Sequence, residues 1–152
     1  MSKANDINWH WRHFDTFTAR EWHEVLRLRA EVFVVEQDCP YVDPDHKDGS
    51  SWHLCGHADG KLIATLRVVA PGVSYVEPSI GRVVTDINWR GEGLGHILMQ
   101  HGLAFCRAEF GGGVRISAQA HLEGLYQSHG FRTVRGPYDE DGIPHLEMLL
   151  TF

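Results

Sequence analysis

The stretch that decides the fold is Arg90-Gly-Glu-Gly-Leu-Gly-His96, which follows the apolar run Ile80-Gly-Arg-Val-Val-Thr85. Its three glycines carry no Cβ, so the backbone at this point can approach a ligand closely. A helical apolar pattern from Gly93 to Phe110 comes next. The free N–H groups and the positive dipole end of such a helix attract an anion, and Arg90 adds a charge-assisted donor. The sequence therefore predicts an anion-binding turn between a strand and a helix.

Two common phosphate-binding patterns fit this turn poorly. The P-loop ends in Gly-Lys-Ser/Thr, whereas His96-Ile97 stands at that point. A dinucleotide-binding turn needs GxGxxG and an acidic ribose ligand on the next strand. Here the third glycine comes one position early, at Gly95, and the strand Val114 to Ala118 has no acidic residue. A purely structural turn remains an alternative, although packing alone does not readily explain three glycines so close together.

Working outward from the turn, the apolar periodicity predicts ten elements in the order β-α-β-β-β-α-β-α-β-β. Thr18-Ala-Arg-Glu21 is typical of a capping box, and Asp59-Gly60 suits a tight hairpin turn. We expect one domain over residues 1–152, of the α/β class (α+β type), with a mixed, mostly antiparallel twisted sheet flanked by helices. The expected elements are strand 7–14, helix 18–35, strands 52–58 and 61–69, a strand from 76 or 80 to 85, helix 93–110, strand 114–118, helix 122–129 and strands 131–135 and 145–150, with long loops at 37–51 and between the last two strands.

Composition narrows the function classes. The formal net charge of −6 argues against a nucleic-acid partner, because such proteins need a basic face. Three cysteines without a CxxC spacing are typical of a reducing compartment rather than of a disulfide framework. The N-terminal residues lack the apolar core of a signal peptide, and no apolar run is long enough to span a bilayer. We therefore expect a cytoplasmic protein with no membrane partner.

Two segments partly match metal-binding patterns, but each lacks one of the ligands that its pattern needs. His23-Glu-Val-Leu-Arg27 carries an arginine where the HExxH pattern of zinc proteases needs its second histidine. The acidic segment Asp43 to Gly49 places Lys47 where a calcium loop needs an oxygen ligand. We expect no metal cofactor.

The turn and a later segment together match a known family. Arg90-x-x-Gly93-x-Gly95 resembles the (Q/R)xxGx(G/A) signature of the GNAT family of N-acetyltransferases, and Tyr126-Gln-Ser-His-Gly-Phe131 resembles its later Tyr-xxx-Gly-Phe segment. The expected order of elements agrees with that family. The segments that are similar to its ElaA-like branch are Val32-Phe-Val-Val-Glu-Gln37 with Cys39-Pro-Tyr41, Ala118-Gln-Ala-His-Leu122 and Glu140-Asp-Gly-Ile-Pro-His145.

This resemblance implies acetyl-CoA as the donor and cosubstrate, bound by a monomer or homodimer. Two parallel strands near 80–85 and 114–118 would diverge, with the thioester in the gap between them. Backbone groups of Val83, Val84 and Thr85 would pair with the pantetheine arm. His121 and Leu122 would lie beside the cofactor, His121 in a capping or positioning role. The residues implied to hold the pyrophosphate are Arg90, Gly91, Glu92, Gly93, Leu94, Gly95 and His96.

The chemistry of amine acetylation indicates which side chains to look for. An alkylamine has a pKa near ~10.4 and a thiol near ~8.5, so a base for the amine and an acid for the leaving thiolate both help. Tyr126 is the candidate acid, and the alternative is a core tyrosine with a satisfied hydroxyl. The candidate bases are Glu36 and His145. For Glu36, either burial at an apolar helix end raises its pKa, or it is an ordinary surface carboxylate. For His145, an imidazole is suited to act as a base near neutral pH, and the alternative is that it only hydrogen-bonds the loop 139–141.

The sequence thus predicts an N-acetyltransferase that moves an acetyl group from acetyl-CoA to a primary amine of a small molecule or peptide. The alternative is a non-catalytic CoA-binding or sensing module on the same fold. Cys39 and Cys106 suggest a covalent acyl-enzyme route as an alternative, but direct attack of the amine on the thioester is favoured. The acidic net charge slightly favours a cationic acceptor, whose pocket we expect to be built by the loops 37–51 and 136–145.

Overall fold

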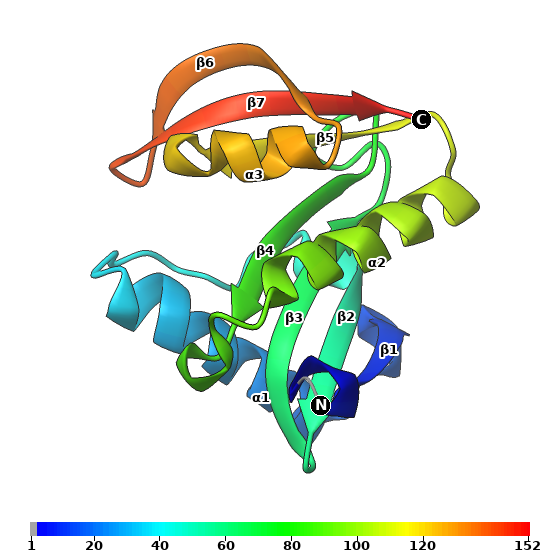
Figure 1. The fold of residues 1–152 in the computed structure, drawn as a ribbon, viewed down its shortest axis with the longest axis vertical. Coiled ribbons are helices and arrows are strands. Elements are labelled where there is room, and N and C mark those ends of the chain that lie inside the picture. Colours follow the sequence, from blue (N-terminus) through cyan, green and yellow to red (C-terminus); the bar gives the residue numbers. More distant parts are fainter. Residues whose placement is uncertain (1–2) are drawn as a thin grey trace.

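The computed structural model describes residues 3–152, so the first two residues of the expected domain lie outside it. The helices and strands follow the predicted order (Figure 1). Within the described residues, no helix has both the length and the apolar composition that a membrane span requires. The elements are β1 (Asn8–His13), α1 (Ala19–Arg29), β2 (Ser51–Ala58), β3 (Lys61–Val69), β4 (Ser79–Thr85), α2 (Leu94–Glu109), β5 (Gly113–Gln119), α3 (Glu123–Ser128), β6 (Arg132–Glu140) and β7 (Ile143–Thr151).

The strands form two antiparallel sheets, in the orders β1-β2-β3-β4 and β5-β7-β6. β4 and β5 begin side by side and then diverge, as Figure 1 shows. Near the start of both strands, the Arg115 N–H donates to the Pro78 carbonyl at 3.1 Å. The parallel, diverging strands implied by the resemblance are therefore present. The gap between them opens toward the carboxyl ends of both strands.

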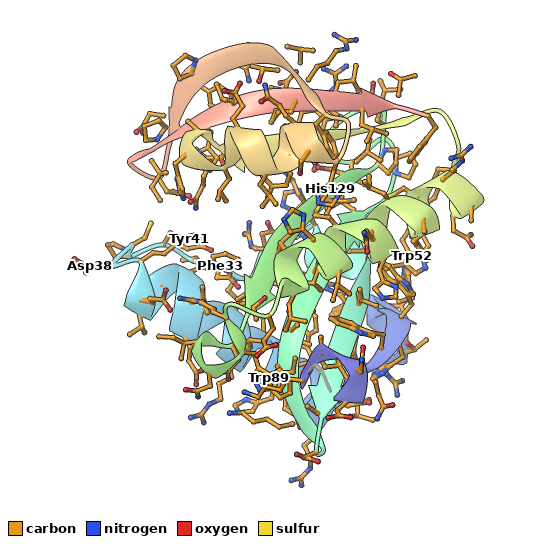
Figure 2. All side chains as sticks on the ribbon, viewed as in Figure 1. Phe33, Asp38, Tyr41, Trp52, Trp89 and His129 are labelled. Atoms are coloured by element: carbon orange, nitrogen blue, oxygen red, sulfur yellow. The ribbon has the colours of Figure 1, made fainter. Side chains whose placement is uncertain are left out.

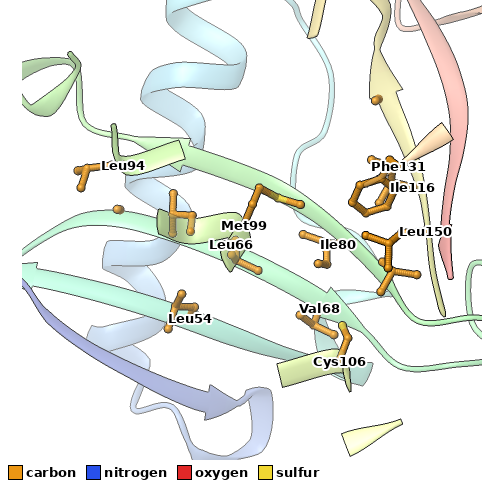
Figure 3. Packing of buried hydrophobic residues seen from close by; sticks show 14 of the residues in the cluster. Leu54, Leu66, Val68, Ile80, Leu94, Met99, Cys106, Ile116, Phe131 and Leu150 are labelled. Atoms are coloured by element: carbon orange, nitrogen blue, oxygen red, sulfur yellow. The ribbon is translucent and has the colours of Figure 1, made fainter. Parts of the chain in front are cut away.

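The two long helices cover opposite faces of the larger sheet. α2 places Leu94, Leu98, Met99 and Cys106 in the main apolar cluster with β2, β3 and β4, to which β5 and β7 also contribute (Figure 3). α1 packs Val25 and Leu28 against the other face of the sheet. The predicted capping box starts α1: the Glu21 N–H donates to Thr18 Oγ1 at 3.1 Å, and the Thr18 N–H donates to Glu21 Oε1 at 2.9 Å.

The end of the first helix differs from the prediction. The α-helical part stops at Arg29, and a π-helical segment, η3 (Ala30–Glu36), continues the same run. The Gln37 N–H donates to the Val32 carbonyl, five residues back, at 3.1 Å. Such wide turns occur mostly as single turns at functional sites. Sequence periodicity at 3.6 residues per turn does not separate them from an α-helix.

The predicted loop 136–145 is wrong, because most of it is strand. β6 runs on to Glu140 and β7 starts at Ile143, so that Asp141-Gly142 alone forms the turn, with φ values of 54° and 80°. Two successive positive φ angles are typical of the tight primed turns of hairpins. Pro137 had indicated a loop, but β6 is an edge strand and its register shifts between Arg135 and Tyr138. Proline is tolerated in edge strands and at such shifts.

A buried network of ion pairs fastens the predicted loop 37–51 to the sheet. Arg29 contacts Asp43 at 2.8 Å and Asp48 at 2.9 Å, and it is fully buried. The acidic residues that suggested a calcium loop thus take arginines as partners. Residues 3–152 hold no group of three or more His, Cys, Asp or Glu side chains placed to bind a metal ion. The remaining pairs are Arg67 with Asp45 and Asp48, and Arg82 with Asp43 and Asp45.

His53, buried beside this network, should make stability depend on pH. Its Nε2 lies 3.3 Å from the Asp48 carbonyl, and burial lowers its pKa to about 4. An unfolded chain takes up this proton near pH 6.5, so the stability present above pH 6.5 should be lost progressively toward pH 4, on the order of 3 kcal/mol. We expect His53→Gln to flatten urea-unfolding free energies between pH 6.5 and 4.5. An unchanged pH slope in the variant would contradict this assignment.

Candidate active site

A cavity of about 560 Å³ opens where β4 and β5 diverge. β4 contributes Ile80 to Val83, and β5 contributes Ile116 to Gln119. Tyr41, Asp45 and Lys47 line it from the 37–51 loop, and Glu140, Asp141 and His145 from the β6–β7 hairpin. Four predicted site residues, Val83, Leu122, Tyr126 and His145, meet in its wall. Glu36 does not line this cavity.

The wall formed by β4 has an irregularity at the predicted pantetheine strand. Thr65 is paired with Val84 and Arg67 with Gly81, which leaves Arg82 and Val83 without partners in β3. Arg82 has a φ of 48°, so the strand bulges there. β4 is also the edge of its sheet, and backbone groups on a sheet edge are free to pair with another extended chain. The two amides of a pantetheine arm are suitable partners for this edge.

Val84 and Thr85 contribute differently from Val83. Both are paired with β3, and the Val84 side chain is buried against α1. In an antiparallel ladder, a residue directs its N–H and C=O either to its neighbour strand or away from it. Any contact from Val84 or Thr85 to a ligand would therefore be made by backbone groups on the open edge.

The glycine-rich turn forms an open cradle at the N-terminus of α2. Gly91 and Gly93 adopt left-handed φ angles of 83° and 74°, which favour glycine. Gly95 has no such requirement: it is helical, and a Cβ there would meet no atom within 4 Å. Since a helix glycine costs about 1 kcal/mol relative to alanine, packing does not account for Gly95. Close approach of a ligand does account for it.

The donors of this cradle are backbone amides. The Ile97 N–H donates to the carbonyl of the N-cap residue Gly93, at 3.3 Å, and this is the first backbone hydrogen bond at the start of α2. The amides of Leu94, Gly95 and His96 have no hydrogen-bond partner in the described part of the chain. Three free amides and the helix dipole favour an anion, so the residues present fit a pyrophosphate. Leu94 itself is buried in the core, which leaves only its amide for this role.

Arg90 and Glu36 form an ion pair at this cradle, although they are 54 residues apart. Arg90 Nη2 donates to Glu36 Oε1 at 2.8 Å, and Nη1 donates to Oε2. Of the two alternatives for Glu36, burial with a raised pKa is wrong, and the surface carboxylate is the one that the structure shows. Its side chain is 38% exposed, and the hydrogen bonds from Arg90 lower its pKa. Glu36 therefore stays ionised at neutral pH and occupies the guanidinium that a pyrophosphate would use.

This pairing predicts the effect of Glu36→Gln. Removing the carboxylate frees Arg90 and takes a negative charge away from the cradle, so acetyl-CoA should bind about two- to fivefold more tightly, an effect typical of exposed ion pairs. Because Glu36 does not line the cavity, kcat should stay within about threefold, against the 10²–10⁴-fold that removal of a general base costs. Calorimetric titration and initial rates measure both quantities. A hundredfold loss of kcat would restore Glu36 as the base.

Glu92 and His121 make no contact that explains their predicted roles. Glu92 forms no hydrogen bond or ion pair with residues 3–152, and its carboxylate would repel a pyrophosphate, so only its backbone suits the cradle. The capping role of His121 is wrong: the N-cap of α3 is Leu122, and no side chain caps this helix. His121 is exposed in the short 3-10 turn Ala120–Leu122 before α3.

A pair of histidines connects the cradle helix to α3. His96 Nδ1 lies 3.0 Å from His129 Nε2, and His129 is placed between α3 and α2 (Figure 2). Burial, and then the charge of His96, lower the pKa of His129. His129 was missed in the sequence, although it lies inside the Tyr126–Phe131 segment that carries the resemblance. Its partner His96 is 33 residues away, and local pattern does not reveal such a pair.

Tyr126 presents a free phenol to the cavity. Its ring packs edge to face on Phe131, with centroids 6.0 Å apart. The phenol oxygen makes no hydrogen bond to residues 3–152, so no group in the described part of the chain satisfies its hydroxyl. Burial raises the pKa of Tyr126, and the group therefore remains protonated at neutral pH. A protonated hydroxyl with no other partner is suited to give its proton to a leaving group.

His145 belongs to a polar group in the part of the cavity wall that the β6–β7 hairpin contributes. Its Nδ1 lies 2.7 Å from the Ile143 carbonyl, which can only accept, so Nδ1 carries a proton. Its Nε2 lies 3.1 Å from Glu140 Oε2. Ser117 Oγ lies 3.3 Å from Glu140 Oε2 and 2.6 Å from Tyr138 Oη. Sequence reasoning missed Glu140 and Ser117, and the Asp141-Gly142 turn was the available signal.

The cysteines do not favour a covalent route. Cys39, Cys55 and Cys106 are all unpaired and buried. Burial raises the pKa of Cys106 to about 12, so its thiol stays protonated, and the protonated thiol is a poor nucleophile. Cys39 Sγ contacts the Asp141 carbonyl at 3.6 Å. This contact joins the 37–51 loop to the β6–β7 hairpin.

Acyl transfer from coenzyme A requires three features that this site has. They are an edge strand with a bulge, a helix N-terminus open to an anion, and a free phenol in the gap between them. This class of acyltransferase agrees with the comparisons. A family model described as "Acetyltransferase (GNAT) domain" matches residues 46–152. The chain belongs to the GNAT acetyltransferase family, and its relatives place it in the ElaA-like branch of that family. Members of this family use an acyl-CoA and an acceptor substrate.

Three relatives illustrate how far the likeness extends. A UPF0039 protein of Synechocystis is 43% identical over 146 residues, 95% of each chain. The crystal structure of an acyl-CoA N-acyltransferase from Pseudomonas aeruginosa is 41% identical with a TM-score of 0.91, over 95% of this chain and 99% of the other. The structure of Escherichia coli ElaA is 37% identical with a TM-score of 0.87, again over 95% and 99% of the two chains.

Proposed function

We propose that residues 1–152 form an N-acetyltransferase domain that moves the acetyl group of acetyl-CoA to a primary amine by direct attack. The observation that carries the proposal is the cavity between β4 and β5, where the free phenol of Tyr126 and the Glu140–His145 pair are both in the wall. Aminolysis of a thioester needs a donor and an acceptor of protons in one cavity.

The donor is held by the chain at two places. The amides of Leu94, Gly95 and His96 bind the pyrophosphate, with Arg90 contributing once Glu36 releases it. The open edge of β4 from Val83 to Thr85 pairs with the pantetheine amides. Leu122 and Tyr126 contact the thioester end from the α3 side of the cavity.

The reaction then follows from the positions of the proton carriers. The ammonium form of the acceptor gives a proton to the Glu140–His145 pair, and the free amine attacks the thioester carbonyl. Unpaired backbone groups at the Arg82–Val83 bulge stabilise the tetrahedral oxyanion. When the C–S bond breaks, Tyr126 gives its proton to the thiolate sulfur. The attacking nitrogen still carries one proton more than an amide, and it gives this proton through solvent to the Tyr126 phenolate, which restores the phenol. The proton taken up by the Glu140–His145 pair leaves to solvent.

The test is the release of free thiol when protein, acetyl-CoA and a panel of primary amines are mixed, with the acetylated amine identified by mass spectrometry. Turnover above the rate without protein supports the proposal. Binding of CoA without turnover for any amine would favour the non-catalytic sensing module. Absence of CoA binding would contradict both and return the glycine turn to a structural role.

A further inference from the structure

One wall of the cavity holds a guanidinium whose hydrogen-bonding capacity the fold uses only in part. Arg67 lines the cavity and is 5% exposed. Its Nη1 donates to Asp45 Oδ1 at 2.7 Å and to Asp48 Oδ1 at 2.9 Å. Its Nε is buried without a partner in the described part of the chain, and Nη2 makes no hydrogen bond to these residues either. A buried donor without a partner is costly, so this edge of Arg67 is suited to a ligand.

The two unused groups form one recognition edge. In a guanidinium, the Nε–H and one Nη2–H bond point the same way and run parallel. A carboxylate accepts such a pair with both oxygens, which adds geometric specificity to the charge. Since Arg67 is nearly inaccessible except through the cavity that it lines, a partner for this edge must come from within the cavity.

Lys47 adds an uncompensated cation to the same wall. Its backbone is fixed, because its N–H donates to Asp45 Oδ1 at 3.0 Å and its carbonyl accepts from Ser51 Oγ at 2.6 Å. Its Nζ forms no ion pair or hydrogen bond among residues 3–152, and the side chain lines the cavity. This wall is cationic overall: Arg29, Arg67, Arg82 and Lys47 face only Asp43, Asp45 and Asp48.

The hairpin side of the cavity has the opposite character. Glu140 and Asp141 line it from the β6–β7 turn, and only Glu140 has a basic partner there, His145. A ligand in this cavity thus meets cationic groups on the wall formed by β3 and the 37–51 loop, and carboxylates on the wall formed by the hairpin. A molecule with a carboxylate and an ammonium group matches both walls.

We propose that the acetyl acceptor is an amino acid, whose carboxylate binds the free edge of Arg67 and Lys47 while its amino group lies beside the Glu140–His145 pair. This assignment rests on the proposed acetyltransferase function and names the substrate class of the same site. It replaces the cationic acceptor that the net charge of −6 favoured, because the charge of the cavity wall, not that of the whole surface, meets the substrate.

A carboxylate at Arg67 has a second possible source, an acyl group such as succinyl. The position of Arg67 favours the acceptor. Arg67 is paired with Gly81, ahead of the bulge at Arg82 and Val83, and its acidic partners come from the 37–51 loop. Tyr126 and Leu122, which contact the thioester in the proposed function, come from the α3 side. The experiment therefore includes both donors.

The test compares initial rates for amino acids with those for their carboxamides and decarboxylated amines, for example alanine with alaninamide and ethylamine, and lysine with cadaverine. We expect kcat/KM to be at least about tenfold higher for the amino acids, as for hydrogen bonds to charged groups. Arg67→Lys keeps the charge that Asp45 and Asp48 need but removes the parallel edge, and Lys47→Met leaves the buried network intact. Both variants should reduce this preference, chiefly through KM. Arg20→Gln removes an exposed positive charge on α1 and is the matched control.

Several results would overturn this assignment. One is an equal kcat/KM for an amino acid and its decarboxylated amine. Another is that Arg67→Lys and Lys47→Met lower kcat/KM by the same factor for the amino acid and for its decarboxylated amine. An Arg67-dependent preference for succinyl-CoA over acetyl-CoA would move the carboxylate to the donor. If no amine is acetylated, the proposed function fails; calorimetric binding of amino acids to the CoA-loaded protein, weakened in Lys47→Met, then decides the carboxylate site separately.

Discussion

Gly95→Glu should weaken acetyl-CoA binding by at least about 100-fold, because like charges placed in contact cost several kcal/mol. The glutamate side chain would start over the free amides of the first turn of α2, where a pyrophosphate is expected. The fold should survive, since Gly95 has an ordinary helical φ and a Cβ there meets no atom within 4 Å. Gly95 is a cleaner position than Gly93, whose φ of 74° makes any substitution strained. Calorimetric titration with acetyl-CoA and urea unfolding measure the two effects separately.

Two controls separate charge from position. Gln100→Glu adds the same charge on an exposed face of α2, away from its N-terminus, and should change the affinity by less than about threefold because such charges are screened. Gly95→Ala introduces only a methyl group, so its effect on the affinity for acetyl-CoA reports how closely the pyrophosphate approaches the backbone at residue 95. If Gly95→Glu binds acetyl-CoA as well as Gln100→Glu does, the pyrophosphate lies elsewhere and the cradle is wrongly assigned.

Tyr126→Phe should lower kcat by about 10²- to 10³-fold, the range expected when a general acid is removed, and leave the affinity for acetyl-CoA within about twofold. The variant removes one oxygen and keeps the ring that packs on Phe131. Since the phenol makes no hydrogen bond to the described residues, its removal leaves no buried group without a partner. Stopped-flow or steady-state thiol release gives kcat, and fluorescence or calorimetry gives the affinity.

The identity of the leaving group provides the control for Tyr126. An acetyl thioester whose thiol has a much lower pKa needs less help from an acid, so the loss in Tyr126→Phe should shrink with such a donor. Phe131→Leu perturbs the packing of the ring but keeps the phenol, and should cost much less. A wild-type kcat in Tyr126→Phe would remove Tyr126 from the mechanism.

The sequence was sufficient for the order of elements and for the glycine turn before α2, because both depend on local pattern. The glycines of residues 91–95 stand next to a helical apolar repeat, and the same short stretch determines the φ angles and the start of the helix together. The capping box at Thr18 and Glu21 is likewise contained within four residues. Features of this kind need no knowledge of distant parts of the chain.

Several missed features depend on pairs of residues that are far apart in sequence. Glu36 looked like the buried end of an apolar helix, and nothing within ten residues indicates that Arg90 will hold it at the surface. His129 meets His96 only because α3 lies against α2. Arg67 stands in a strand that reads as apolar core, and its free edge appears only once Asp45 and Asp48 are known to occupy Nη1 alone.

Turn chemistry explains the one misplaced segment. Pro137 and Pro144 indicated a long loop after residue 135, but β6 is an edge strand that tolerates proline, and Asp141-Gly142 closes the hairpin. The correction matters for function, since the hairpin places Glu140 beside His145 at 3.1 Å. A flexible loop would not hold these two side chains in a fixed position.

A crystal structure of the protein with CoA tests the central claim most directly. The account predicts the pyrophosphate within hydrogen-bond distance of the amides of Leu94, Gly95 and His96, the pantetheine along the open edge of β4, and the thiol beside Tyr126 in the gap between β4 and β5. Arg90 should have turned from Glu36 to the phosphates. A pyrophosphate bound away from the α2 N-terminus, or a thiol outside that gap, would contradict it.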